Sequence, residues 1–211
     1  MIMYAIGFLA QCFFSARVLF QWILSERAHK VLSPSIFWIL SIAGSYLLCV
    51  YGWLREDFAI ILGQFISYYV YLWNLKQKDV WAKIPLLFRL ILLCTPAIAT
   101  IGVEMRTEGI SEIFFHNTEI PLWMVIFGSI GQLLFTFRFI YQWLYSRKHN
   151  ESILPRGFWI ISLGGSAIII SYGVMRLDPV LMICQSIGCI PYIRNLMIGY
   201  REEKTYNAKS E

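Results

Sequence analysis

An internal repeat limits what this chain can fold into more than any other feature. When the sequence is shifted by about 121 residues, the segment 132–196 falls on the segment 11–75 without a gap. Roughly a third of the aligned residues are identical, and they include most of the polar residues that stand in apolar runs. Identical pairs include Arg17/Arg138, Gln21/Gln142, Ser41/Ser162, Gly44/Gly165, Tyr71/Tyr192 and Asn74/Asn195. The chain is therefore expected to contain two copies of one unit and a connector.

The composition indicates the solvent in which these units fold. Hydrophobic residues make up 58% of the chain and charged residues only 15%, whereas a soluble domain carries about 25% charged residues. Several apolar runs approach the ~20 residues that a helix needs to cross a bilayer. The first run follows no basic segment and precedes no small-residue cleavage site, so it is expected to be a retained span. We predict an all-α integral membrane protein with little mass outside the membrane.

Each copy is expected to form a three-helix bundle. In the first copy the helices are placed near residues 3–24, 34–53 and 58–75, with Asp57 as the N-cap of the third and Asp178 as its counterpart. The glycines Gly44 and Gly165 fall in the second helix of each copy and are expected to let helices approach closely. The domains are then a first repeat (1–75), a connector (76–119), a second repeat (120–198) and a cytoplasmic tail (199–211).

The connector decides the relative direction of the two copies. Its segment 86–103 is apolar, although Arg89 and Pro96 interrupt it. If this segment is a linker helix that spans the membrane, the two repeats are parallel, in a 3+1+3 arrangement of about seven spans; otherwise they are inverted. The parallel arrangement gathers nearly all loop cations on one side, which by the positive-inside rule places the N-terminus outside and the C-terminus in the cytoplasm. These cations are Arg27, Lys30, Lys76, Lys78, Lys83, Arg147, Lys148, Arg156, Arg201, Lys204 and Lys209.

Catalysis by this chain alone is not expected. The cysteines lie in apolar runs without a CxxC pair, and the histidines have no partners at ligand spacing, so neither a metal nor a cofactor is predicted. No nucleophile stands with a base, and no carboxylate pair falls inside a predicted span. The residues concerned are Cys12, Cys49, Cys94, Cys184, Cys189, His29, His116 and His149.

Polar side chains inside the predicted spans mark a candidate ligand site. Arg17 and Arg138 lie about two helical turns from the cytoplasmic end, where a lipid-facing charge costs roughly 2.5–3.5 kcal/mol. A guanidinium that faces the bundle interior instead suits a phosphate or a sugar hydroxyl. Alternatively, the arginines reach toward the headgroups and the amides only tie helices together. The predicted ligand-binding residues are Arg17, Gln21, Gln64, Tyr71, Asn74, Arg138, Gln142, Gln185, Tyr192 and Asn195.

Several motifs resemble one known family. The pattern Gln-x5-Arg-x3-Gln-Trp-x2-Ser starts at Gln11 and again at Gln132, Pro-x2-Phe-Trp-Ile-x-Ser follows in each copy, and Tyr-Ile-Arg-Asn-Leu ends the second copy. Together they resemble the lipid A biosynthesis N-terminal domain, a three-span module found joined to lipid-A-disaccharide synthase or alone beside glycolipid enzymes in Gram-negative bacteria. The first copy departs from the pattern, with Trp73 where the second has Arg194. The arrangement is also similar to SWEET and PQ-loop sugar transporters, although the Pro-Gln dipeptide is absent.

The resemblance and the charged interior lead to three hypotheses. The first is a protein of the bacterial inner membrane that binds or translocates a phosphorylated glycolipid of lipid A or lipid-linked sugar metabolism. The second is a SWEET-like facilitator of a small sugar or other solute, and the third is a membrane anchor for a glycosyltransferase. The synthase activity itself is not implied, because no soluble glycosyltransferase portion follows. Membrane lipids, a lipid-linked sugar or a glycosyltransferase are the expected partners, and nucleic acid is not.

Overall fold

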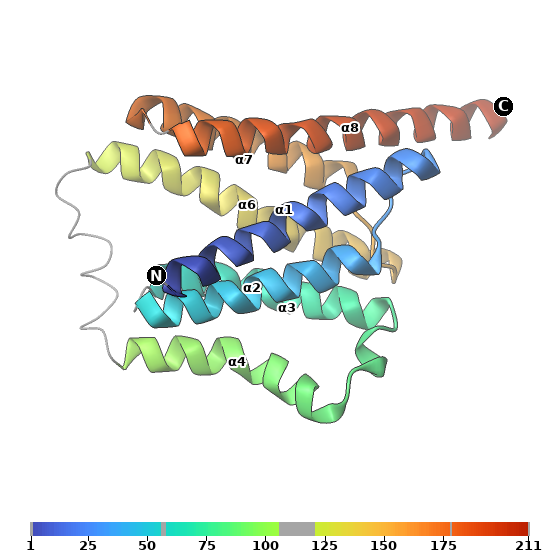
Figure 1. Ribbon diagram of the computed structural model, residues 1–211. Helices are drawn as coiled ribbons and strands as arrows, with labels where there is room; N and C mark the ends of the chain where they lie inside the picture. The colour runs from blue at the N-terminus through green and yellow to red at the C-terminus, as the bar shows by residue number, and fades with distance from the viewer. Residues whose placement is uncertain (1, 56–57, 106–120, 178, 211) are drawn as a thin grey trace. The chain divides into compact units, whose positions relative to one another are not determined.

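The computed structural model describes residues 2–55, 58–105, 121–177 and 179–210. Throughout these residues every regular element is a helix, which confirms the predicted all-α class. The helices are α1 (Ile2–Ala28), α2 (Ser35–Arg55), α3 (Phe58–Gln77), the short 3-10 helix η1 (Trp81–Lys83), α4 (Leu86–Glu104), α6 (Leu122–His149), α7 (Arg156–Arg176) and α8 (Pro179–Ser210), as Figure 1 labels them. The predicted caps Asp57 and Asp178 lie outside the described residues.

The chain forms two compact units, and the boundary between them runs through α1. The first unit comprises residues 1–17 and 35–119, and the second comprises residues 18–34 and 120–211. The C-terminal half of α1 and the loop after it thus pack with the helices of the second repeat. The sequence repeat assigns all of α1 to the first copy, so the units of the structure differ here from the units of the sequence.

In the first unit, α2 packs against both α3 and α4. Its buried core includes Phe37 and Trp38 from α2 and Tyr68 and Tyr71 from α3. The first half of α1 approaches α2 closely at Gly44, where an added Cβ would lie 3.2 Å from the backbone oxygen of Ala10. This is the close approach that a small residue at position 44 predicts.

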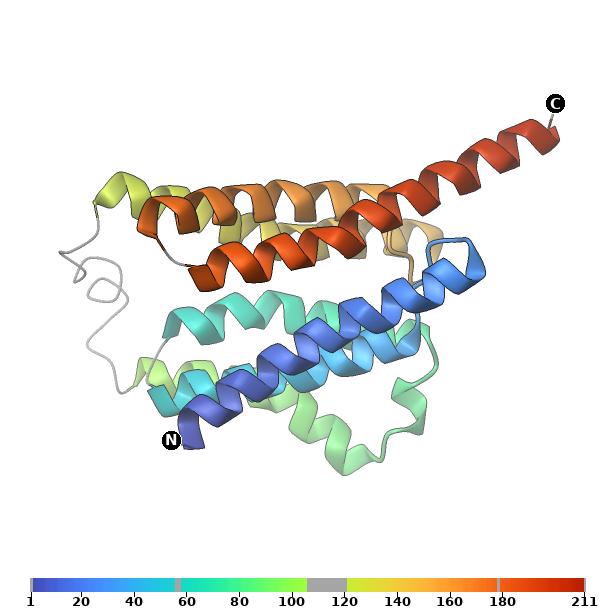
Figure 2. The same ribbon diagram turned by 45° about the horizontal axis from the view of Figure 1, so that its top comes forward.

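In the second unit, α7 packs against both α6 and α8, the yellow-to-red helices of Figure 1. A Cβ at Gly165 of α7 would lie 3.3 Å from the backbone oxygen of Gly131 in α6, which repeats the contact at Gly44 almost exactly. Helix α8 is helical through Ser210, so residues 199–210 of the predicted tail continue it. Figure 2 shows this end of α8 projecting past the first turn of α7.

The connector holds a helix where the sequence places one. Helix α4 covers Leu86–Glu104 and contains Pro96. The other interruption, Arg89, folds back on the turn that precedes the helix: its Nε donates to the carbonyl oxygen of Ile84 (2.6 Å) and its Nη2 to that of Ala82 (2.7 Å). The guanidinium thus supplies hydrogen bonds to two backbone oxygens of the turn that leads into α4.

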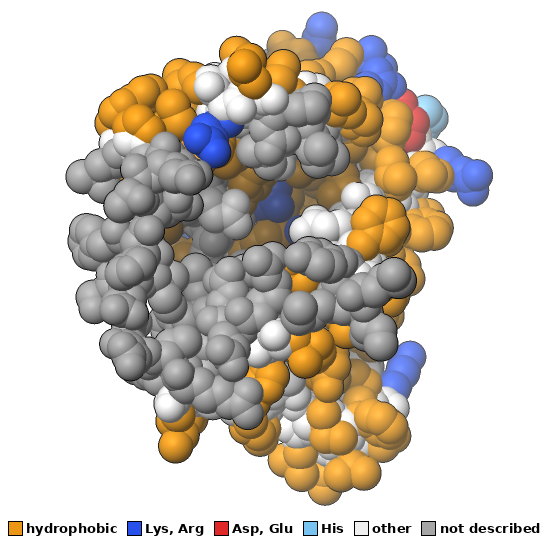
Figure 3. All heavy atoms as spheres, turned by 60° about the vertical axis from the view of Figure 1, so that its left-hand side comes forward, with side chains coloured by type: hydrophobic (Ala, Val, Ile, Leu, Met, Phe, Trp, Pro, Cys, Tyr) orange, Lys and Arg blue, Asp and Glu red, His pale blue; other side chains and the backbone are white. Residues whose placement is uncertain are grey.

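Apolar side chains cover much of the outer surface of the helices. On α4 alone, Leu86, Leu87, Phe88 and Ile98 are more than half exposed, and Figure 3 shows hydrophobic side chains over most of the coloured part of one face. Two helical segments among the described residues, Ala5–Ala28 and Arg156–Arg176, are long and apolar enough to cross a membrane. These features are consistent with membrane association, whereas the number and direction of the spans stay predictions.

Candidate ligand-binding site

The second unit surrounds a buried arginine with side chains from three helices. Arg138 of α6 is only 7% exposed. Its Nη1 donates to the Ser162 hydroxyl of α7 (3.1 Å) and to the Tyr192 hydroxyl of α8 (3.2 Å). Ser162 donates its own hydrogen to the carbonyl oxygen of Phe158, one turn earlier (2.6 Å), so its lone pairs are left to accept from the guanidinium.

Aromatic rings enclose the same guanidinium. The Cζ of Arg138 lies 4.6 Å from the ring centre of Phe135, 4.9 Å from Phe139 and 5.3 Å from Phe158. Cation–π attraction compensates part of the desolvation of the charge. Within the described residues, no carboxylate pairs with Arg138 and its Nε has no hydrogen-bond acceptor. A buried positive charge without an anion is costly, so this group is suited to receive one.

The first unit repeats this arrangement around Arg17, which is 5% exposed. Its Nη1 donates to the Ser41 hydroxyl of α2 (2.9 Å) and to the Tyr71 hydroxyl of α3 (3.1 Å). The rings of Phe14, Phe37 and Tyr71 lie 4.7, 5.3 and 5.5 Å from its Cζ. Each unit therefore contains an arginine held by one serine, one tyrosine and a set of aromatic rings.

The glutamines of the third helices bind the second helices instead of the arginines. Ser45 of α2 donates to Gln64 Oε1 at 3.1 Å, and Ser166 of α7 donates to Gln185 Oε1 at the same distance. Both glutamines are half-buried. These pairs lie on the small-residue stretches of α2 and α7, next to Gly44 and Gly165.

Gln21 and Asn195 form a reciprocal amide pair that links α1 to α8 in the second unit. Gln21 Nε2 donates to Asn195 Oδ1 (2.8 Å), and Asn195 Nδ2 donates to Gln21 Oε1 (3.0 Å). Both side chains are fully buried. Gln21 also reaches the Ser25 hydroxyl (2.9 Å) and the carbonyl oxygen of Leu32 (3.0 Å), so the amide fixes the loop after α1 as well.

The equivalent amide in α6 holds the equivalent loop. Gln142 Nε2 donates to the Ser146 hydroxyl (2.8 Å) and to the carbonyl oxygen of Ile153 (2.8 Å). Ser146 in turn accepts from the backbone N–H of Ile153 (3.0 Å). Asn74 of α3 donates to the carbonyl oxygen of Val70 (2.9 Å) and has further interactions of its own.

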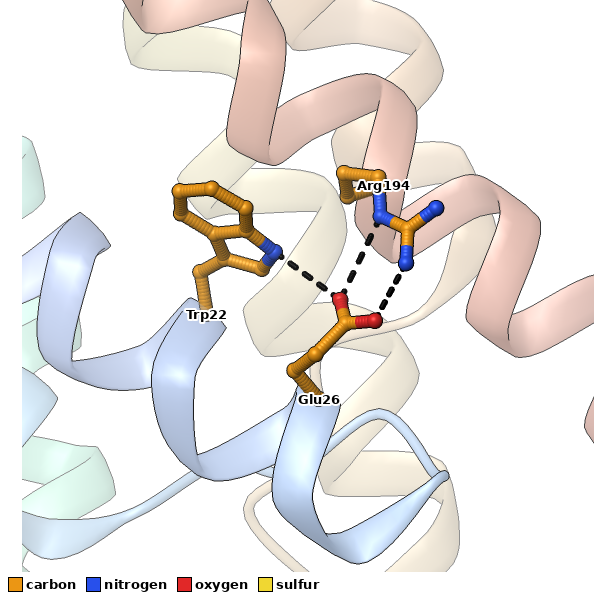
Figure 4. A network of polar contacts seen from close by, with 3 residues as sticks. All are labelled: Trp22, Glu26 and Arg194. Carbon is orange, nitrogen blue, oxygen red and sulfur yellow. Dashed lines mark hydrogen bonds and ion pairs between the residues drawn. The ribbon is translucent and has the colours of Figure 1, made fainter.

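An ion pair also joins α1 to α8 in the second unit. The guanidinium of Arg194 in α8 forms a bidentate ion pair with the carboxylate of Glu26 in α1, and Trp22 Nε1 donates to Glu26 Oε2 at 3.1 Å (Figure 4). The repeat does not predict this pair, because Arg147 stands at the position of Glu26 and Trp73 at that of Arg194. Arg147 lies 5.5 Å from the Trp143 ring.

The structure joins some of the predicted ligand residues and separates others. Each arginine contacts the tyrosine of its own unit, whereas the glutamines at 64 and 185 and the Gln21–Asn195 pair bond elsewhere. Sequence reasoning missed Ser41 and Ser162, although their identity in both copies was a usable signal. Binding of a ligand by the ten predicted residues stays a prediction.

Comparison with known proteins agrees with the repeat. The family model described as the Lipid A Biosynthesis N-terminal domain matches twice, over residues 6–76 and 127–197. Similar relatives are the lipid-A-disaccharide synthases of Chlamydia pneumoniae (31% identical, covering 97% of this chain) and Chlamydia felis (30% identical, covering 96%). This chain spans 34% of the length of each. No solved structure matches.

These matches cover about two thirds of the chain with a single family model and repeat the internal division found in the sequence. They indicate a role related to lipid A, in agreement with the resemblance carried by the motifs from Gln11 and Gln132. The chain belongs to the lipid A biosynthesis N-terminal domain family and carries two copies of that domain.

Proposed function

We propose that this chain is an integral membrane protein of lipid A or lipid-linked sugar metabolism that binds the phosphorylated head of a glycolipid. The observation that carries the proposal is Arg138, which is 7% exposed and, among the described residues, has no carboxylate partner. A guanidinium presents a planar fork of donors that matches phosphate oxygens. Arg17, held by the equivalent serine and tyrosine, supports a second site of the same kind.

The proposed setting is the bacterial inner membrane, with seven spans, parallel repeats and the N-terminus outside. The apolar outer faces of the helices support a lipid environment, because exposed apolar patches of this extent are unfavourable in water. The clustering of loop cations supports the orientation. This topology is proposed to place each arginine near the cytoplasmic leaflet, where a phosphorylated precursor made in the cytoplasm would arrive.

The chain is proposed to bind or translocate this lipid without changing it chemically. The side chains that meet at Arg138 are hydroxyls, aromatic rings and a guanidinium, none of which stands with a general base among the described contacts. Facilitated transport of a neutral solute, which would use Asn195, has less support, because that amide is already paired with Gln21.

A second candidate role is to anchor a glycosyltransferase of the same pathway. It is favoured by the comparison with the chlamydial synthases, of whose length this chain spans 34%. Under this reading, the enzyme co-purifies with the chain, and replacing Arg17 or Arg138 leaves the association unchanged. If the chain binds a glycolipid instead, replacing either arginine should weaken binding of that lipid.

The two roles are separated by measuring binding of a synthetic phosphorylated acyl-sugar to the full chain in lipid nanodiscs. Arg138→Gln and Arg17→Gln should each weaken binding roughly 10- to 100-fold, since a hydrogen bond to a charged group contributes about 1.5–3 kcal/mol. Arg201→Gln is the matched control, because the same change falls on an exposed position of α8. Equal affinity in all four proteins would refute the proposal, as would equal binding of the dephosphorylated acyl-sugar.

A further inference from the structure

The second unit contains hydrogen-bond donors for which the described residues offer no acceptor. Arg138 Nε and the indole nitrogen of Trp159 are both buried without a partner in this part of the chain. The Tyr192 hydroxyl accepts from Arg138 Nη1, and its own hydrogen meets no acceptor among the described contacts. Buried polar groups nearly always hydrogen bond in native proteins, so three such donors in one unit require an explanation.

These donors belong to one neighbourhood. The ring of Trp159 lies 5.9 Å from that of Tyr192, and the Cζ of Arg138 lies 5.8 Å from the same Tyr192 ring. Phe158 contacts both Trp159 and Arg138: its ring centre lies 4.9 Å from that of Trp159 and 5.3 Å from Arg138 Cζ. Trp159 itself is fully buried. The side chains that carry the three donors therefore lie close together in the second unit.

The nearby acceptor is already in use. Ser162 accepts from Arg138 Nη1 and gives its hydrogen to the carbonyl oxygen of Phe158. The cluster thus has an excess of donors and a positive charge, and it needs a group that brings acceptors alone. A sugar hydroxyl would add another hydrogen that requires an acceptor, whereas a phosphate oxygen accepts without donating.

We infer that Trp159 is a further ligand-contacting residue, whose indole N–H and Arg138 Nε–H donate to oxygens of one phosphate group in the second unit. The inference rests on the proposed function and extends it, because it names the oxyanion and a residue that sequence reasoning did not select. The phosphate can belong to a lipid headgroup or be free in solution, and both offer the same oxygens. Conformational opening must accompany binding, since the indole nitrogen is buried in the present state.

The test compares Trp159→Phe with Trp38→Phe in the full chain in nanodiscs. Both changes remove an indole N–H and keep an aromatic ring, and Trp38 is the counterpart of Trp159 in the first copy, with interactions of its own. Affinity for the phosphorylated acyl-sugar should fall about tenfold in Trp159→Phe, the loss of one hydrogen bond to a charged acceptor. It should stay within about twofold of wild type in Trp38→Phe.

The outcomes separate this inference from the proposed function. If Arg138→Gln weakens binding and Trp159→Phe does not, the inference is wrong and the proposed function stands. If neither change matters, both are wrong. If inorganic phosphate competes with the acyl-sugar, the site binds any phosphate group; if it does not compete, the site binds the phosphate of a lipid headgroup. In both cases the inference also requires that Trp159→Phe weakens binding of the acyl-sugar.

A spectroscopic measurement keeps the inference testable if Trp159→Phe does not fold. The indole N–H resonances of the eight tryptophans can be assigned from substitutions of the others, which leaves Trp159 by elimination. Adding the phosphorylated acyl-sugar to wild-type protein should shift the Trp159 resonance downfield, as formation of a hydrogen bond to an anion requires. An unmoved resonance at saturating ligand would overturn the inference.

Discussion

Replacing Gln21 by leucine breaks the reciprocal amide pair that joins α1 to α8. The wild-type pair consists of two hydrogen bonds of 2.8 and 3.0 Å between fully buried side chains. After the change, Asn195 Nδ2 keeps its bond to the carbonyl oxygen of Pro191 (2.8 Å), but Asn195 Oδ1 loses the donor that Gln21 supplied. The carbonyl oxygen of Leu32 also loses the amide N–H.

The cost follows from these losses. An orphaned buried polar group costs about 1–3 kcal/mol, and two acceptors lose a donor here, while leucine fills a similar volume. The free energy of unfolding should therefore fall by about 2–4 kcal/mol. In Gln21→Leu/Asn195→Leu both partners become apolar, so the double change should cost less than the sum of the single changes, with a coupling of about 1–3 kcal/mol.

The assay is a double-mutant cycle on the full chain, with reversible unfolding by a denaturing detergent followed by circular dichroism. Gln185→Leu is the control, because it removes one half-buried bond of 3.1 Å to Ser166 and should cost about 0.5–1.5 kcal/mol. Strictly additive costs at 21 and 195 would refute the reasoning. So would a Gln21→Leu variant that is no less stable than Gln185→Leu.

Three further changes test other contacts. Glu26→Gln or Arg194→Gln should lower the thermal stability only slightly, and the loss should shrink with added salt, because the pair is partly exposed; a large, salt-insensitive loss of thermal stability would contradict this. Gly165→Ile should lower the free energy of unfolding by about 1–3 kcal/mol, since an added Cβ would lie only 3.3 Å from a backbone oxygen of α6. Gly164→Ile should be tolerated, because the nearest atom to a Cβ there is 4.0 Å away. Equal melting temperatures of the two variants would contradict this expectation. Arg89→Ala should raise hydrogen exchange in the turn that precedes α4, where the carbonyl oxygens of Ala82 and Ile84 lose their donor, and unchanged exchange would argue against the described role.

The repeat predicted much of the fold, because identical residues at one offset require one local structure twice. The second helix of each copy begins directly after a proline, at Ser35 and at Arg156, one residue later than the start near residue 34 that the sequence predicts for the first copy. The arginines are buried, as the cost of a lipid-facing charge at that depth predicts. The close approaches at Gly44 and Gly165 also follow from residue size alone.

The partners of these residues could not be predicted in the same way. Helical spacing places Gln21 and Asn195 on faces of their helices but does not tell that each is the other's partner 174 positions away. The Glu26–Arg194 pair occurs at positions where the two copies differ, so comparing the copies does not predict it. Likewise, periodicity cannot show that α1 divides between two units at Arg17 and Val18, because that division depends on which helices its two halves contact.

The most direct test of the central proposal is to identify the lipid that stays with the gently purified protein, by native mass spectrometry of the wild type and of Arg17→Gln/Arg138→Gln. The account predicts that the wild-type chain retains a phosphate-bearing glycolipid and that the double variant, folded to the same extent, has lost it. Retention of the same lipid by both proteins, or of neutral lipids only by the wild type, would contradict the account.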